Sequence, residues 1–228
     1  MAYRRTEKVA RRLAARHAAI IAAARALAAE RGMAGMQIAP VAERAGIAAG
    51  TVYRYFPSKG DMVTALVTAV SEREIGAMRR AADAAPGPLS ALVAAIATFA
   101  ARALAARRLA WAVLAEPADP EVAAVRIAYR RALAAEIAAR LAAAISAGHL
   151  PEQDTALAAP AVVGALIEGL VGPLAPELPD DPAKARAAAQ TLTLLALRAL
   201  GVVDARARGL VVQAPIQSAE DEGQTTEL

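Results

Sequence analysis

The side chains best suited to contact another molecule lie close together between Tyr53 and Lys59. The chain of 228 residues has only seven aromatic side chains, and three of them, Tyr53, Tyr55 and Phe56, fall within four positions. Arg54 lies between the two tyrosines. Hydroxyl, guanidinium and ammonium groups all donate hydrogen bonds to anionic oxygens. This segment therefore carries the chemistry needed to hold phosphate groups and to reach the edges of bases.

The charge of the chain is unevenly distributed along its length. The net charge is +4, but residues 1–60 contain eleven Lys and Arg against three Asp and Glu, whereas residues 61–228 contain fifteen against nineteen. A basic N-terminal part beside a mildly acidic remainder favours a polyanionic partner at the N-terminus. A solvated charged face explains the same counts equally well, so charge alone does not decide between the two.

The chain is predicted to be almost entirely helical. Alanine, the best helix former, dominates it, and no part shows the sustained alternation of a strand. Periodicity and the breakers between periodic stretches predict helices over Glu7–Arg31, Ile38–Ala45, Ala48–Phe56, 59–84, Leu89–Arg107, Leu109–Ala115, Pro120–Ala147, Glu152–Leu174 and Pro182–Leu200. We therefore expect an all-α protein of about nine helices. It divides into a three-helix module at 1–58, a larger domain at 59–202 and a tail at 203–228 with a disordered end.

The second and third predicted helices form a helix-turn-helix signature, joined by the turn Ala-Gly-Ile. A helix presented in this way fits the major groove of double-stranded DNA, which is about 12 Å wide. At about 100° per residue, Ala48, Val52 and Phe56 share one face of the third helix, whereas Gly50 and Arg54 point the opposite way. The alternative is that the two tyrosines are core aromatics whose hydroxyls only reach water.

The fourth predicted helix begins directly after Ser58. Ser58 and Asp61 have the spacing of a capping box, in which each side chain accepts a hydrogen bond from the backbone amide of the other residue. Lys59 then lies in the first helical turn, where its charge and the unpaired backbone amides both attract a phosphate.

These residues resemble the N-terminal domain of the tetracycline-repressor (TetR) family of bacterial regulators. The resemblance covers about residues 15–66, and its most specific part is the run G-T-V-Y-x-Y-F-x-S-K, which begins at Gly50. Members of that family are dimeric DNA-binding proteins, mostly repressors that a small ligand releases from DNA. The resemblance implies a cytoplasmic, nucleoid-associated regulator with a C-terminal effector-binding and dimerisation domain. Two alternatives are an activator or global DNA binder of the same fold and a non-regulatory helical protein that binds small molecules.

The resemblance also implies a role for each residue of the third helix. Gly50 allows close backbone approach and Thr51 lies at the groove, while the tyrosines and Lys59 match phosphate contacts. Ala49 and Arg54 occupy positions that read the operator. The DNA-binding residues implied are Ala49, Gly50, Thr51, Tyr53, Arg54, Tyr55 and Lys59.

The sequence departs from the family in two places. Ala48 replaces a serine that caps the third helix and touches phosphate, and Met36 and Gln37 stand where a threonine is usual. A basic N-terminal arm could compensate by following the DNA backbone or entering a minor groove, although a solvated basic terminus is an equally good reading. The arm consists of Arg4, Arg5, Lys8, Arg11, Arg12 and Arg16.

The larger domain offers candidates for an effector pocket. Arg126 falls on the apolar stripe of its helix, near Tyr129, and an inward arginine is costly unless it is paired. It would meet an acidic group of the effector, or a structural carboxylate such as Glu116 or Glu168. Apolar residues could line the pocket or belong to the ordinary core. The candidates are Met78, Phe99, Trp111, Arg126, Tyr129 and Glu168.

The last two long predicted helices, at about 152–174 and 182–200, are expected by resemblance to form a homodimer as a four-helix bundle. Two-fold symmetry then requires a nearly palindromic operator with half-sites about 34–36 Å apart. No enzyme motif occurs, and neither His17 nor His149 has a neighbour that supports a metal site. We therefore expect no catalysis, no cofactor, no metal and no membrane span.

Overall fold

A computed structural model of the chain describes residues 2–117, 120–178 and 181–214, except for the side chains of residues 2–6 and 8. Within this part the protein contains ten α-helices and no strand, which confirms the expected all-α class. The helices are α1 (Ala2–Arg31), α2 (Ile38–Arg44), α3 (Ala49–Tyr55), α4 (Lys59–Asp83), α5 (Pro88–Ala105), α6 (Arg107–Leu114), α7 (Pro120–Ser146), α8 (Thr155–Leu170), α9 (Pro182–Ala199) and α10 (Asp204–Gln213).

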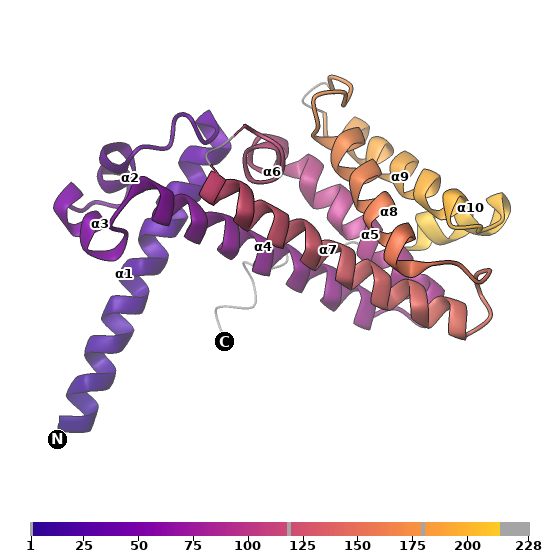
Figure 1. The fold of residues 1–228 in the computed structure, drawn as a ribbon, viewed down its shortest axis with the longest axis horizontal. Helices are drawn as coiled ribbons and strands as arrows, with labels where there is room; N and C mark the ends of the chain where they lie inside the picture. The colour runs from indigo at the N-terminus through magenta and orange to yellow at the C-terminus, as the bar shows by residue number, and fades with distance from the viewer. Residues whose placement is uncertain (1, 118–119, 179–180, 215–228) are drawn as a thin grey trace.

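Helices α2 and α3 pack with the C-terminal half of α1 at one end of the molecule, and α8, α9 and α10 lie at the other end (Figure 1). Helices α4 and α7 run side by side along the length between them. The first turns of α1 project away from the other helices. The three-helix module is attached to the larger domain by contacts of α1 with α4 and α6, in addition to the short link between α3 and α4.

Helix α5 forms the centre of the larger domain, because it packs against α4, α7 and α9 and buries every residue from Ala91 to Ala100. Among the described residues it is the one helix long and apolar enough to cross a membrane, and 78% of that stretch is buried inside the fold. Its apolarity is therefore that of a core helix.

Side-chain caps explain where the later helices begin. The Asp154 carboxylate accepts a hydrogen bond from the Ala156 amide at 2.8 Å, so α8 begins three residues later than predicted. Asp181 accepts from the Ala183 amide in the same way and starts α9 at the predicted Pro182.

Helix α10 corrects the prediction of about nine helices with only a tail after residue 202. Asp204 starts this helix and forms ion pairs with Arg198 and Arg208, the latter at 2.9 Å. Ala207 and Val211 are buried, and α10 packs against α9 and α5. The predicted disorder concerns residues 215–228, which lie outside the described part of the chain.

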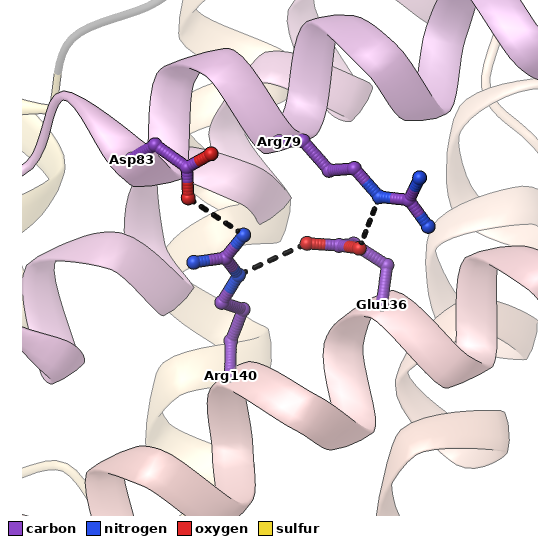
Figure 2. Close-up of polar contacts among 4 residues, drawn as sticks. All are labelled: Arg79, Asp83, Glu136 and Arg140. Carbon is purple, nitrogen blue, oxygen red and sulfur yellow. Dashed lines mark hydrogen bonds and ion pairs between the residues drawn. The ribbon is translucent and has the colours of Figure 1, made fainter.

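A chain of four charged side chains joins the C-terminal half of α4 to α7 (Figure 2). Arg79 donates to Oε2 of Glu136 at 2.8 Å, and Arg140 donates to Oε1 of the same carboxylate at 2.9 Å. Arg140 also contacts Asp83 at 2.9 Å. Glu136 is buried, whereas the Asp83 side chain is 67% exposed. The carboxylate that stabilises this contact most should therefore be the buried one.

Replacing Glu136 with Gln should lower the free energy of unfolding by about 1–3 kcal/mol, because a buried carboxylate then loses its charge-assisted hydrogen bonds. The matched variant Asp83→Asn removes an exposed partner of the same arginine and should change stability by less than about 0.5 kcal/mol. Urea unfolding followed by circular dichroism measures both variants. An equal loss of unfolding free energy in the two variants would contradict the conclusion that Glu136 contributes more than Asp83.

Candidate nucleic-acid interface and effector pocket

Helix α3 buries one side and exposes the other, as its sequence predicts. Val52 and Phe56 are buried, whereas Tyr53 is 53% exposed and Arg54 is exposed beside it. Gly50 is also exposed, and a Cβ atom added there would meet no other atom within 4 Å. The outward surface of α3 is therefore an open backbone flanked by a phenol and a guanidinium group.

Tyr55 and the end of α3 are supported by α1. Tyr55 is half-buried and packs against the core. The ring of His17 lies with its centroid 5.0 Å from that of Phe56 and 6.4 Å from that of Tyr55. The structure thus places His17 at the surface against the aromatic end of α3. Thr51 and Lys59 are half-buried, and Ala49 is exposed.

The predicted capping box at the start of α4 is confirmed. The Ser58 hydroxyl accepts a hydrogen bond from the Asp61 amide at 3.0 Å, and Oδ2 of Asp61 accepts one from the Ser58 amide at 3.0 Å. Lys59 is the first residue of the helix that this box holds in place. The cap fixes Lys59 at the N-terminus of α4, four residues after Tyr55, the last residue of α3.

Ala48 is the N-cap of α3, with extended backbone dihedrals and no side chain that can accept from the helix amides. Helical periodicity placed it on the buried face with Val52, and this prediction was wrong. Ala48 is exposed because it precedes the first helical turn. The predicted absence of a side-chain cap is confirmed. Gln37, the N-cap of α2, also makes no cap hydrogen bond, and its side chain donates to the Ala34 carbonyl at 3.2 Å.

The basic arm forms the first part of α1. Arg11 and Arg12 are exposed, Arg16 is half-buried, and Arg11 lies 3.5 Å from the exposed carboxylate of Glu7. The side chains of Arg4, Arg5 and Lys8 lie outside the described part. The described arginines are available to a partner that approaches α1 along its exposed side.

The N-terminal module matches a known family of proteins. Residues 20–66 match the family model for bacterial regulatory proteins of the tetR family. That match spans α2, α3, the capping box and most of the module's buried core. The N-terminal module belongs to the TetR family. The resemblance found in the sequence is therefore confirmed, and the protein is a DNA-binding transcription regulator, not an enzyme, with a helical C-terminal domain.

Solved structures share the fold of this chain over most of its length. RolR (NCGL1110) in complex with resorcinol is 23% identical, with a TM-score of 0.65 over 92% of this chain and 98% of that one. FadR from Bacillus subtilis in complex with stearoyl-CoA is 20% identical, with a TM-score of 0.65 over 81% and 98%. PfmR from Thermus thermophilus is 23% identical, with a TM-score of 0.61 over 78% and 97%. No curated protein matches the sequence.

A small cavity lies in the larger domain, between α4, α5, α6 and α7. Its volume is about 30 Å³, and its walls are mainly apolar. Residues from all four helices line it, together with Arg25 of α1, and among them are Glu74, Phe99, Arg102, Val113, Leu114 and Tyr129. Such a volume admits a water molecule but not a drug-sized ligand. In the described structure this cavity therefore has no room for a ligand of that size.

The polar wall of the cavity is an ion pair that was not predicted from the sequence. Nε of Arg102 lies 2.5 Å from Oε2 of Glu74, and Nη2 lies 2.9 Å from Oε1. The Arg102 side chain is 4% exposed and that of Glu74 is 17% exposed. The available signal was that Arg102 is the one charged residue in the very apolar helix α5. Its partner on α4 could not be identified without the fold.

Tyr129 completes the polar part of the cavity. Its side chain is almost fully buried, and this burial, together with the negative charge of Glu74, raises the pKa of its hydroxyl well above the usual value. The hydroxyl therefore remains protonated and can donate a hydrogen bond to a group in the cavity.

The structure separates the six pocket residues predicted from the sequence. Phe99 and Tyr129 line the cavity, Met78 is fully buried in the core and Trp111 packs half-buried against it. Glu168 accepts from the Leu174 amide at 2.9 Å beyond the end of α8. Arg126 donates to the backbone carbonyls of Ala112 and Glu116 instead of lining the cavity. Burial lowers its pKa, with the Glu116 charge acting in the opposite direction.

An open groove of about 530 Å³ lies outside the cavity, between α1, α4 and α6. Its floor is mostly alanine, with Ile21 and Leu109, and basic side chains such as Arg73 border it. The groove and the cavity share Arg25, Ala106 and Leu109 as lining residues. The groove and the cavity therefore adjoin each other at the junction of the two domains.

Restoring a hydroxyl at the N-cap should strengthen α3. We expect Ala48→Ser to raise the free energy of unfolding by about 1 kcal/mol, because its oxygen can accept from an unpaired helix amide. Ala49→Ser adds the same group one position later, inside the helix, and should change stability by less than about 0.5 kcal/mol. Thermal unfolding of both variants gives the comparison. An equal gain in stability for Ala48→Ser and Ala49→Ser would mean that helix capping does not cause the gain.

Proposed function

We propose that this protein is a repressor that binds a nearly palindromic operator as a homodimer in the cytoplasm and is released by a small-molecule effector. The main observation is the surface of α3, where Gly50, Tyr53 and Arg54 face outward directly beside Lys59 at the capped start of α4. A bare backbone, a phenol and two cationic groups form a face that suits the major groove and its phosphates.

Different residues of this face have different tasks in the proposal. Arg54 and Ala49 read the bases, because both are exposed on the outward side of α3. Tyr53, Tyr55 and Lys59 hold phosphates, Lys59 with the help of the free amides at the start of α4. Gly50 and Thr51 allow the close approach of α3 to the groove.

Selection of bound sequences from random DNA, followed by titration with salt, tests this proposal. Arg54→Ala should cost about 1–3 kcal/mol on the selected operator and relax the preference at one base position. Lys59→Ala should weaken binding to all sequences and lower the salt slope by about 1. Arg131→Ala, an exposed change on α7, is the control and should alter neither quantity.

If the selection from random DNA yields no preferred sequence, the proposal that the protein is a sequence-specific regulator is contradicted. The second candidate function, a helical protein that only binds small molecules, would then remain. Selection of many unrelated sequences with the same affinity would instead indicate a global DNA binder, because sequence-independent binding rests on phosphate contacts alone.

The proposed effector site is the cavity lined by Phe99 and Tyr129, to which the Arg102–Glu74 pair contributes its polar wall. A benzene-sized molecule needs about 150 Å³, several times the present volume, so binding must move the surrounding helices. This requirement supports ligand control, because a ligand shifts an equilibrium only by favouring one of two states. A compact ligand with a hydroxyl or carboxyl group fits these walls. The structure of RolR with resorcinol shows that a protein of this fold binds such a molecule.

The proposed dimer forms through α8 and α9, which lie side by side at the end of the molecule opposite α3 (Figure 1). Many of their outward residues are small or apolar, while Lys184, Arg186 and Arg198 are exposed charged residues of α9. On α8, Leu157 is 72% exposed, and Ala161 and Gly164 follow it along the exposed side. On α9, Leu195 is 52% exposed. Small residues allow close helix contact, and apolar residues left in water favour a second copy of the surface.

A charge in this surface should abolish the dimer. Leu195→Glu should elute at the mass of a monomer in size-exclusion chromatography with light scattering, because the carboxylate would be buried against its own copy. Ile127→Glu, which places the same charge on a half-exposed position of α7, is the control and should remain dimeric. A dimer that survives Leu195→Glu would place the interface elsewhere.

A further inference from the structure

Glu116 connects the effector domain to the DNA-binding module by its side chain. It lies in the segment directly after α6, yet Oε2 accepts a hydrogen bond from the Met33 amide at 2.9 Å, and Oε1 lies 3.4 Å from the Ala34 amide. These amides belong to the turn between α1 and α2, some 80 residues earlier in the chain. One carboxylate therefore holds the turn that leads into the helix-turn-helix.

The turn is shaped to receive this carboxylate. Gly32 ends α1 with a φ of +72°, a conformation that favours glycine. A Cβ atom at Gly32 would lie 3.0 Å from Oε2 of Glu116. The absence of a side chain at Gly32 thus allows the carboxylate to approach the two amides from above the turn.

On the effector side, two arginines of α7 hold the segment that carries Glu116. Arg126 donates to the carbonyls of Ala112 and Glu116, and Arg130 donates to the carbonyl of Leu114. These contacts cover backbone carbonyls at the end of α6, which have no partner within that helix. The position of Glu116 is therefore fixed by the end of α6 and by its attachment to α7.

The same end of α6 forms a wall of the cavity. Val113 and Leu114 line it, and Glu116 follows Leu114 by two residues. A molecule that enlarges the cavity must push against this wall, against Arg25 of α1, or against α4, α5 or α7. Movement of the end of α6 would carry Glu116 away from the amides of Met33 and Ala34, because those bonds tolerate little displacement.

We propose that Glu116 is the positioning residue that transmits occupancy of the cavity to the DNA-binding module. This inference rests on the proposed ligand-responsive function and adds the contact through which it acts. With the cavity closed, the carboxylate holds the α1–α2 turn and fixes the orientation of the module. With the cavity filled, the contact opens and the module loses that orientation.

Since the effector is unidentified, a bulky side chain serves as the probe of occupancy. Val113→Phe enlarges a side chain that lines the cavity and is combined with Glu116→Ala in a double-mutant cycle on the selected operator. In the wild-type background we expect Val113→Phe to weaken operator binding by about 5-fold or more, the lower range of allosteric coupling. In the Glu116→Ala background the same change should weaken binding by less than about 2-fold.

Two further variants separate transmission from general loss of stability. Glu116→Gln retains one oxygen that can accept a hydrogen bond and should restore part of the response to Val113→Phe. Asp154→Ala removes a carboxylate–amide hydrogen bond confined to the effector domain and should leave the full response in place. If Val113→Phe fails to fold by circular dichroism, Ala110→Leu on the same cavity wall replaces it.

The outcomes distinguish this inference from the function on which it rests. An equal weakening by the cavity variant with and without Glu116 would overturn the role of Glu116 and leave ligand control intact. If neither cavity variant changes operator binding in the wild-type background, ligand control through this cavity is itself contradicted, and the inference with it. Hydrogen exchange of the 32–37 segment should rise when Val113→Phe is introduced, and unchanged exchange would also overturn the proposal.

Discussion

Buried charges must be paired within an otherwise apolar bundle, and this constraint organises the larger domain. Its helices are rich in alanine, and their core is built from buried Leu, Ile, Val and Met side chains, which pack without a fixed direction. Arg102 with Glu74, and Glu136 with Arg79 and Arg140, add directional contacts to this packing. Removing one member of such a set leaves a charge without its partner in a low-dielectric interior, which costs far more than a surface pair. The arrangement of α4, α5 and α7 is therefore specified by charge as well as by packing.

Helix α4 carries charged side chains with structural contacts along its whole length. Its first turn carries Lys59 in the capping box, its middle contributes Glu74 to the cavity wall, and its last turns are tied to α7 through Arg79 and Asp83. The tied end can act as a fixed point while the middle responds to what enters the cavity. The α6 segment with Glu116 offers a second connection to the module that does not run through α4. Two connections from one cavity can change both the position and the orientation of α3.

The sequence predicted those parts of the protein whose chemistry is local. The outward face of α3, the capping box of Ser58 and Asp61 and the missing cap at Ala48 each depend on residues within one or two turns. The Glu74–Arg102 pair and the Glu116 contact depend on helices that are distant in sequence, so no spacing could reveal them. Helix α10 was missed because it is short and has no side-chain cap at its start, and it is held by ion pairs and by packing on α9. Arg126 was correctly predicted to point inward. Its partners are backbone carbonyls, and these could not be identified from the sequence because every residue has one.

The length of α1 gives the contact at its C-terminal end a further consequence. A helix of 30 residues measures about 45 Å at 1.5 Å per residue. If α1 tilts as a rigid rod, it pivots about its C-terminal end, near Gly32 and the Glu116 carboxylate. A tilt of about 5° at that end moves Arg11 and Arg12, which lie about 30 Å away along the helix, by about 2.6 Å. That is close to the length of a hydrogen bond, so a small tilt of α1 would be enough to weaken any contact of Arg11 and Arg12 with a DNA backbone.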